Sequence, residues 1–124
     1  MLAVGSDKGS VVFFNRKTNR KIPCISKHGK KVTLGDWNLE GNLITGSEDR
    51  LLTVSNNQGD TVHESFIAKA DLISLAWCPY KDPAKPKKTV AALVGGKQIL
   101  YLKPETQEHF MFNFSSSYGR AVVF

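Results

Sequence analysis

Cysteine, helical periodicity and long apolar runs are all scarce in this sequence of 124 residues. The two cysteines, Cys24 and Cys78, are too few and too far apart for a disulfide framework or a zinc site, which indicates a reducing compartment. The longest apolar runs, residues 11–14 and 90–94, fall far short of the roughly 20 residues that span a bilayer. The first residues also lack the basic and apolar regions of a secretory signal. These absences predict a cytoplasmic chain without a transmembrane helix.

Strand-forming residues dominate what the sequence does contain. Val, Ile, Thr, Phe and Leu cluster in short runs bounded by Gly, Asn, Asp and Lys. Strands are expected at residues 2–5, 10–15, 21–25, 32–37, 43–47, 51–55, 61–66, 72–77, 89–94, 99–103, 109–114 and 121–124. With no helix between them, neighbouring strands must be antiparallel and joined by tight turns. The pattern therefore predicts an all-β fold.

An internal repeat with a period near 40 residues runs through the chain. Residues 2–15 align without a gap on residues 43–56, with Leu, Gly, Ser and Asn at equivalent places. Trp37 and Trp77 each end a predicted strand that enters the next unit, and residues 91–103 form a weaker third copy. A period near 40 with four strands per unit is typical of a β-propeller blade.

Particular positions of the repeat resemble the Trp-Asp (WD) repeat β-propeller family. That family has a Gly-His pair before the innermost strand, a Ser-Gly-Ser-like run in the second strand, an Asp in the following turn, and Trp-Asp closing the third strand. The matching residues of the best repeat are His28, Thr45, Ser47 and Asp49. In place of Trp-Asp, that repeat has Ser55 and Asn56, and the first repeat has Phe14 and Asn15. The resemblance therefore implies divergent blades in which the family's His, Ser/Thr, Asp and Trp hydrogen-bond set is incomplete.

A more particular resemblance covers residues 2–67. The runs LAVGSDKGSVVFFN and SEDRLLTVSNNQGDT are similar to the amino-terminal propeller of the large WD-repeat subunits of intraflagellar transport complex A. Those subunits are chains of propellers followed by a helical solenoid. The resemblance implies a non-catalytic protein–protein interaction scaffold whose partners are other subunits of a transport complex. It also implies a location in the cytoplasm and at the cilium or flagellum and its base.

The repeat divides the chain into expected blades. Residues 1–26 should supply the second to fourth strands of one blade, 27–67 a complete blade, 68–114 a complete divergent blade, and 115–124 the first strand of another. About three four-stranded antiparallel blades make an open arc rather than a closed ring, because closed propellers typically have four to eight.

An open arc leaves an apolar sheet face without a partner at each end. At roughly 25 cal/mol per Å², a few hundred Å² left bare forfeits on the order of 5 to 10 kcal/mol, comparable to a domain's whole stability. We therefore expect self-association, or pairing with a chain that supplies the missing blades.

The formal charge of +6 raises the alternative of a basic module that binds nucleic acid or an anionic membrane. Most basic residues fall in three groups, within residues 16–21, 27–31 and 81–88. Connections alternate between the two ends of an up-and-down sheet, so the first and third groups share one rim and the second lies on the other. A charge split in this way favours surface contacts over a nucleic-acid groove, and membrane contact only through the basic loops. The partner-binding candidates are Lys27, Lys30, Lys31, Lys81, Lys85, Lys87 and Lys88.

Residue patterns typical of catalysis or metal binding are missing. His28, His63 and His109 lie in different units and lack metal-ligand spacing, and neither GSDKGS nor LVGGKQ has the full spacing of a phosphate-binding loop. We expect no enzyme, no metal and no cofactor. Trp37 and Trp77 should belong to the blade core rather than stack on a ligand.

Pro23 indicates where its strand lies in the sheet. Proline has no backbone N–H to donate to a ladder, so residues 21–25 should be an edge strand, the outermost of their blade.

Overall fold

The structure, a computed structural model, describes residues 1–24, 27–79, 89–114 and 118–123. Within these residues the chain forms β1 (Leu2–Gly5), β2 (Val11–Asn15), β3 (Arg20–Cys24), β4 (Val32–Trp37), β5 (Leu43–Ser47), β6 (Leu51–Ser55), β7 (Phe66–Ile67), β8 (Leu72–Trp77), β9 (Val90–Val94), β10 (Gln98–Lys103) and β11 (Glu108–Asn113). The all-β prediction is confirmed.

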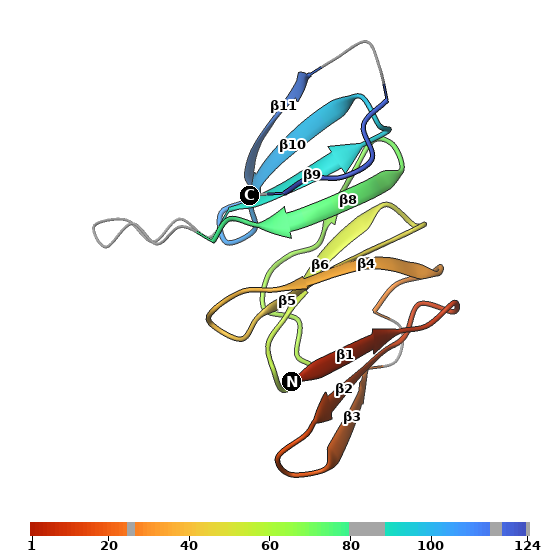
Figure 1. Cartoon of the computed structure of the whole chain (residues 1–124), viewed down its shortest axis with the longest axis vertical. Coiled ribbons are helices and arrows are strands. Elements are labelled where there is room, and N and C mark those ends of the chain that lie inside the picture. The colour runs from red at the N-terminus through yellow and green to blue at the C-terminus, as the bar shows by residue number, and fades with distance from the viewer. Residues whose placement is uncertain (25–26, 80–88, 115–117, 124) are drawn as a thin grey trace, which may run out of the picture.

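The strands form three separate antiparallel sheets. Their orders are β1-β2-β3, β4-β5-β6-β7 and β8-β9-β10-β11, so each strand pairs with its neighbour in sequence. Figure 1 shows the three sheets following one another along the long axis of the molecule, with the N-terminus beside the first sheet. None of the sheets closes on itself. The arrangement is the open arc of blades that the repeat predicts.

Two apolar clusters join consecutive sheets. Val11 and Phe13 alternate with more exposed residues on β2 and pack with Leu43 of the second sheet, and Trp37 joins this cluster with its ring 5.7 Å from that of Phe13. A larger cluster between the second and third sheets includes Ile44 and Trp77. All five residues of β5 and of β9 are buried, because each is an interior strand. Trp77 is thus buried in the larger cluster, and the partly buried Trp37 packs against the smaller one.

The second and third sheets repeat one another in detail. The first strand of each has a register irregularity near its start, between Val32 and Leu34 in β4 and between Leu72 and Ser74 in β8. β3 is the outer edge strand of the first sheet, as the proline predicts, with Pro23 opposite Val12.

Residues 61–66 depart from the predicted strand. Only Phe66 and Ile67 form β7, and Thr61 makes an isolated bridge to Ser55. Leu52 pairs with Phe66, so the segment from Thr61 to Phe66 is two residues longer than the stretch of β6 it accompanies. The extra residues leave the ladder, and the Ser65 hydroxyl contacts the Thr53 hydroxyl instead, at 3.1 Å.

The strand predicted at residues 121–124 is wrong for the described residues 121–123. The segment runs along the third sheet without joining a ladder, since Gly119 N–H donates to Gly96 O and Val122 N–H donates to Ser74 Oγ at 3.1 Å. Elsewhere the predicted strand ends differ from the observed ones by at most one residue.

Candidate functional site

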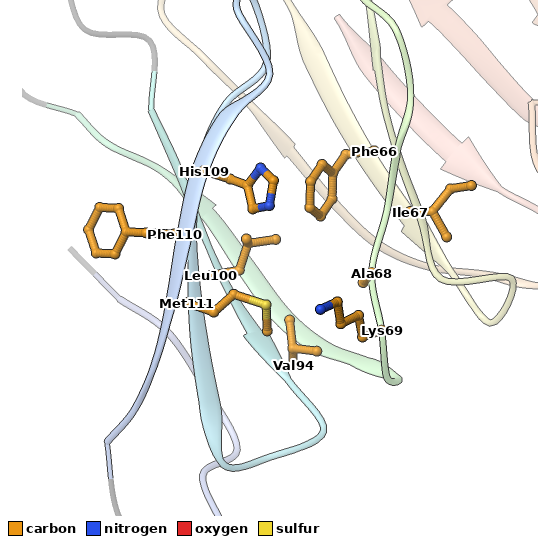
Figure 2. Close-up of a pocket in the computed structure, with 9 residues that line it drawn as sticks. All are labelled: Phe66, Ile67, Ala68, Lys69, Val94, Leu100, His109, Phe110 and Met111. Atoms are coloured by element: carbon orange, nitrogen blue, oxygen red, sulfur yellow. The ribbon is translucent and has the colours of Figure 1, made fainter.

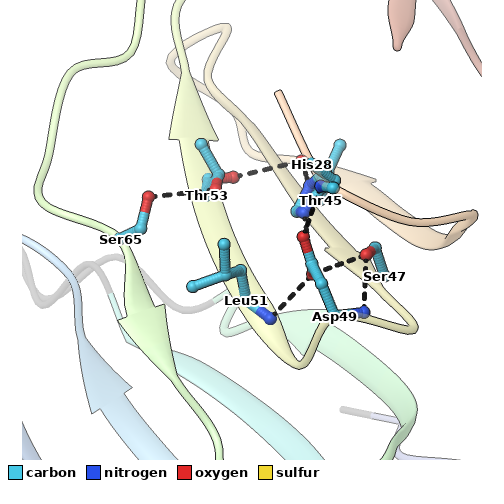
Figure 3. Close-up of polar contacts among 8 residues, drawn as sticks. His28, Thr45, Ser47, Asp49, Leu51, Thr53 and Ser65 are labelled. Atoms are coloured by element: carbon cyan, nitrogen blue, oxygen red, sulfur yellow. Dashed lines mark hydrogen bonds and ion pairs between the residues drawn. The ribbon is translucent and has the colours of Figure 1, made fainter. Parts of the chain in front are cut away.

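A buried polar cluster lies at one rim of the second sheet (Figure 3). His28 comes shortly before β4, Thr45 and Ser47 lie on β5, and Asp49 follows in the β5–β6 turn. The Nε2 atom of His28 lies 2.8 Å from Thr45 Oγ1, and its Nδ1 lies 3.2 Å from Asp49 Oδ1. The structure therefore brings together the four residues that the WD-repeat resemblance selects in this blade.

The first sheet holds the His28 segment in place. His28 N–H donates to the carbonyl of Gly9, in the β1–β2 turn, at 3.0 Å. Gly9 has φ of 95°, and a Cβ atom there would lie 2.0 Å from the His28 carbonyl oxygen. Only glycine tolerates both the conformation and the close approach. The histidine is thus fixed by the sheet before it and the strand after it.

Asp49 is the main acceptor of the cluster. Its carboxylate accepts from the Ser47 hydroxyl, from Leu51 N–H at 3.0 Å and from Gly29 N–H at 2.8 Å, besides His28. Burial alone would raise the pKa of this carboxyl group, but these hydrogen bonds outweigh it and lower the pKa below 3.8. Asp49 is therefore ionised at neutral pH.

The ionised carboxylate fixes the proton positions on His28. Since Asp49 can only accept, Nδ1 of His28 must donate to it. Burial lowers the pKa of His28 below 6.5. The negative charge of Asp49 and its hydrogen bond to the ring raise this pKa, but by less than burial lowers it. The neutral ring then has Nε2 free to accept from the Thr45 hydroxyl. Because His28 and Thr45 are each 4% exposed, we interpret this chain of bonds as a cross-link between strands.

This protonation state makes stability depend on pH. As pH falls below 6.5, His28 of the unfolded chain takes up a proton that the folded chain resists, so the free energy of unfolding should decrease with a slope of at most ~1.4 kcal/mol per pH unit. Urea denaturation from pH 7.5 to 5.5 (roughly one unit either side of the ordinary value) should show this loss, and His28→Gln should reduce the slope. An unchanged slope in the variant would contradict the assignment.

The positions that the family fills with Trp-Asp have a different local role here. Ser55 is buried at the end of β6, and Phe14 is partly buried near the end of β2. The following asparagines cap their turns: Asn15 Oδ1 accepts from Lys17 N–H at 3.0 Å, and Asn56 Oδ1 accepts from Gln58 N–H at 2.9 Å. Asparagine favours such turns because its side chain bonds the backbone two residues on.

Asp36 is a structural residue that the sequence pattern did not single out. Its carboxylate accepts from Trp77 N–H and its carbonyl accepts from Trp77 Nε1–H, both at 2.9 Å. These bonds join the inner strands β4 and β8 of consecutive sheets. The spacing of Trp37 and Trp77 does not reveal that Asp36, the residue before the first tryptophan, accepts hydrogen bonds from the second.

Only some of the basic partner-binding candidates lie within the residues that the structure describes. Lys30 and Lys31 are exposed before β4, and the ammonium of Lys27 donates to Thr61 Oγ1 at 2.7 Å. The candidates Lys81, Lys85, Lys87 and Lys88 lie outside the described residues. Lys27 is thus engaged with the second sheet, whereas Lys30 and Lys31 remain accessible to a partner.

Within the described ranges, no group of three or more His, Cys, Asp or Glu side chains could hold a metal ion. No helix among the described residues is long and apolar enough to cross a membrane.

A family model described as the WDR19 first beta-propeller matches residues 1–124. The chain belongs to this WD-repeat family. It is 35% identical to WD repeat-containing protein 19 of Mus musculus over 127 residues, covering 99% of this chain and 9% of that protein. The Homo sapiens protein of the same name is 36% identical over 101 residues, covering 81% of this chain and 8% of its own length.

A more distant relative and a solved structure are also similar to this chain. The Caenorhabditis elegans WD repeat-containing protein dyf-2 is 27% identical over 120 residues, covering 95% of this chain and 9% of that protein. The crystal structure of the Cps50 (Swd1) β-propeller domain of Myceliophteria thermophila aligns with TM-score 0.70 and 18% identity, covering 93% of this chain and 35% of that one. The chain spans less than a tenth of the length of the curated relatives.

The sheets at both ends of the described set expose apolar residues. Ala3 packs against the first cluster, so strand alternation places Leu2 and Val4, each 58% exposed, on the opposite face of β1. On the far face of the third sheet, the rings of Tyr101 and Phe110 stack with centroids 5.1 Å apart, and Phe110 is 61% exposed. We call the surface with Leu2 and Val4 the N-terminal face, and the surface with Tyr101 and Phe110 the C-terminal face.

Proposed function

We propose that this chain is part of a non-catalytic interaction scaffold in an intraflagellar transport complex, acting in the cytoplasm and at the cilium or flagellum. The observation that carries the proposal is the aromatic stack of the C-terminal face, where Phe112 lies 6.0 Å from Tyr101 and 6.2 Å from Phe110. An exposed group of stacked rings on a sheet is suited to packing against another protein surface. Membership of the WDR19 first-propeller family supports the same function.

Each sheet is proposed to be one blade. The divisions are residues 1–26, 27–67 and 68–114, and residues 115–124 lead into a further blade. The N-terminal and C-terminal faces would then pack on other blades, either of a second copy or of a longer chain. Lys30 and Lys31 are proposed to contact partner subunits at the rim of the second blade, and Lys27 would do so only by giving up its bond to Thr61. Lys81, Lys85, Lys87 and Lys88 are proposed as further partner contacts.

The alternative is a basic module for nucleic acid or anionic membranes, favoured by the charge of +6. Two of the described cations are engaged within the chain, because Lys97 lies over the Tyr118 ring at 4.5 Å and Lys103 pairs with Glu108 at 3.2 Å. Lys30 and Lys31 remain exposed, so a binding experiment has to decide between the two functions.

Affinity purification of the tagged full-length protein from ciliated cells tests the proposal. Subunits of the transport complex should co-purify and remain bound after a wash in roughly 0.5 M salt, because apolar interfaces resist screening. Binding driven by phosphates would instead weaken by about a thousandfold or more between low and moderate salt. Recovery of nucleic acid or lipid in place of transport subunits, lost on the salt wash, would contradict the scaffold function.

A further inference from the structure

The outer strands of the three sheets differ in how they are protected against pairing with another strand. In β3 the edge carries Pro23 and the charges of Arg20 and Lys21. β7 contains two residues only. Proline, charge and short length are the usual ways in which proteins prevent unwanted edge pairing. The outer strand of the third sheet, β11 (Glu108–Asn113), has six residues, no proline and no lysine.

The backbone of β11 has groups directed outwards. Phe114 N–H donates to Lys97 O at 3.3 Å, directly beyond the paired residues. Because bonded positions alternate along an antiparallel ladder, the backbone groups of His109, Met111 and Asn113 point away from β10. Among the described residues, no backbone hydrogen bond on this side is made by any of the three. β11 therefore offers N–H and C=O groups at alternate positions of its free edge.

An apolar groove of about 390 Å³ lies beside this edge, between β11 and the segment that contains β7 (Figure 2). His109 and Met111 line the β11 side of the groove. At one place the Phe66 ring is in edge contact with the His109 ring, with 4.7 Å between the ring centroids. Leu100 lies in the floor. Two of the three residues with outward backbone groups, His109 and Met111, thus also line the groove.

The charge of the groove indicates what kind of segment would fit. Lys69 lines it, and Figure 2 shows its ammonium directed towards Met111. Among the described residues Lys69 has no acidic partner. A carboxylate on the incoming segment would supply one.

A second copy of this chain is a poorer occupant. Pairing of two β11 edges would bring His109, Met111 and Asn113 to face the groove, and none of these is acidic.

We propose that the free edge of β11 binds an extended segment of a partner protein as a fifth strand, with alternate apolar side chains in the groove and a carboxylate beside Lys69. Strand addition of this kind takes affinity from backbone hydrogen bonds and specificity from alternate side-chain pockets. The inference deepens the scaffold function proposed above by giving the chemistry of one partner. It concerns the outer edge of the sheet, which packing of a further blade on the C-terminal face leaves open.

A synthetic peptide provides the test. The probe is a fluorescein-labelled peptide of alternating valine and threonine in which one valine is replaced by glutamate, and the comparison peptide has the same composition in shuffled order. The alternating peptide should bind the 124-residue chain with higher affinity by fluorescence anisotropy. It should also slow hydrogen exchange at the amides of His109, Met111 and Asn113. Equal binding of the shuffled peptide, or unchanged exchange at these amides, would overturn the proposal without any variant.

Two variants separate the backbone and charge contributions. Asn113→Pro removes one outward N–H and should weaken binding roughly fivefold, whereas Asn113→Ala keeps that N–H and should bind normally. Lys69→Glu should weaken binding about two- to fivefold and recover with a peptide that has lysine in place of glutamate, while Lys17→Glu, remote from the groove, should have no effect. If neither Asn113→Pro nor Lys69→Glu changed the affinity for the peptide, the edge site would be overturned.

The other outcomes are also decisive. A dimer that Asn113→Pro abolishes would identify a second copy as the occupant and overturn the peptide proposal. Failure of peptide binding while transport subunits still co-purify would contradict the edge site alone. Loss of that co-purification would contradict the scaffold function itself.

Discussion

Replacing Asp49 with alanine should lower the free energy of unfolding by about 2 to 4 kcal/mol. The substitution removes the acceptor of His28 Nδ1–H, of the Ser47 hydroxyl and of the backbone N–H groups of Gly29 and Leu51. His28 and Ser47 are buried, so their donors would be left without an acceptor and without water, which is more costly than the loss of an average hydrogen bond.

Glu48, the exposed neighbour in the same turn, provides the matched control. Glu48→Ala should change the free energy of unfolding by less than about 0.5 kcal/mol, as substitutions at exposed sites usually do. Urea denaturation of both variants and of the parent chain measures the difference. If Asp49→Ala is no more destabilised than Glu48→Ala, the cluster does not hold the second sheet together.

The fold could be predicted because its information is local and repeated. Short runs of strand-forming residues bounded by turn residues predict strands individually, and the 40-residue period predicts how they group into sheets. Pro23 also places β3 at an edge from backbone chemistry alone. The two-residue β7 could not be predicted in the same way, because Thr61–Phe66 has strand-forming residues but two residues too many for the ladder beside it.

Only part of the site could be predicted from the sequence. The spacing of His28, Thr45, Ser47 and Asp49 matches the family pattern, so these four could be selected without a structure. Asp36 could not, because its bonds to Trp77 depend on how one sheet packs against the next. The groove beside β11 is a similar case, since its walls come from residues more than 40 positions apart.

Self-association of the chain should depend on its C-terminal face. We expect one copy to place this face on the N-terminal face of the next, in the same relation that consecutive sheets have within the chain. Phe110→Glu puts a charge in the aromatic stack and should weaken association by about 30- to 100-fold, the effect of losing an aromatic contact residue at the centre of an interface. Because Phe110 is 61% exposed in the single chain, the fold itself should tolerate the change.

Phe110→Tyr keeps an aromatic ring at the same position and is the matched control for the C-terminal face. Thr18→Glu adds the same charge in the exposed β2–β3 turn and controls for net charge. Both controls should associate like the parent chain.

Sedimentation velocity of the 124-residue chain, from low to high micromolar concentration, tests most directly whether the end faces are interaction surfaces. The parent chain should sediment faster as concentration rises, and Phe110→Glu should sediment as a monomer throughout that range. A parent chain that stays monomeric at every concentration, or a Phe110→Glu variant that associates as the parent does, would contradict the account.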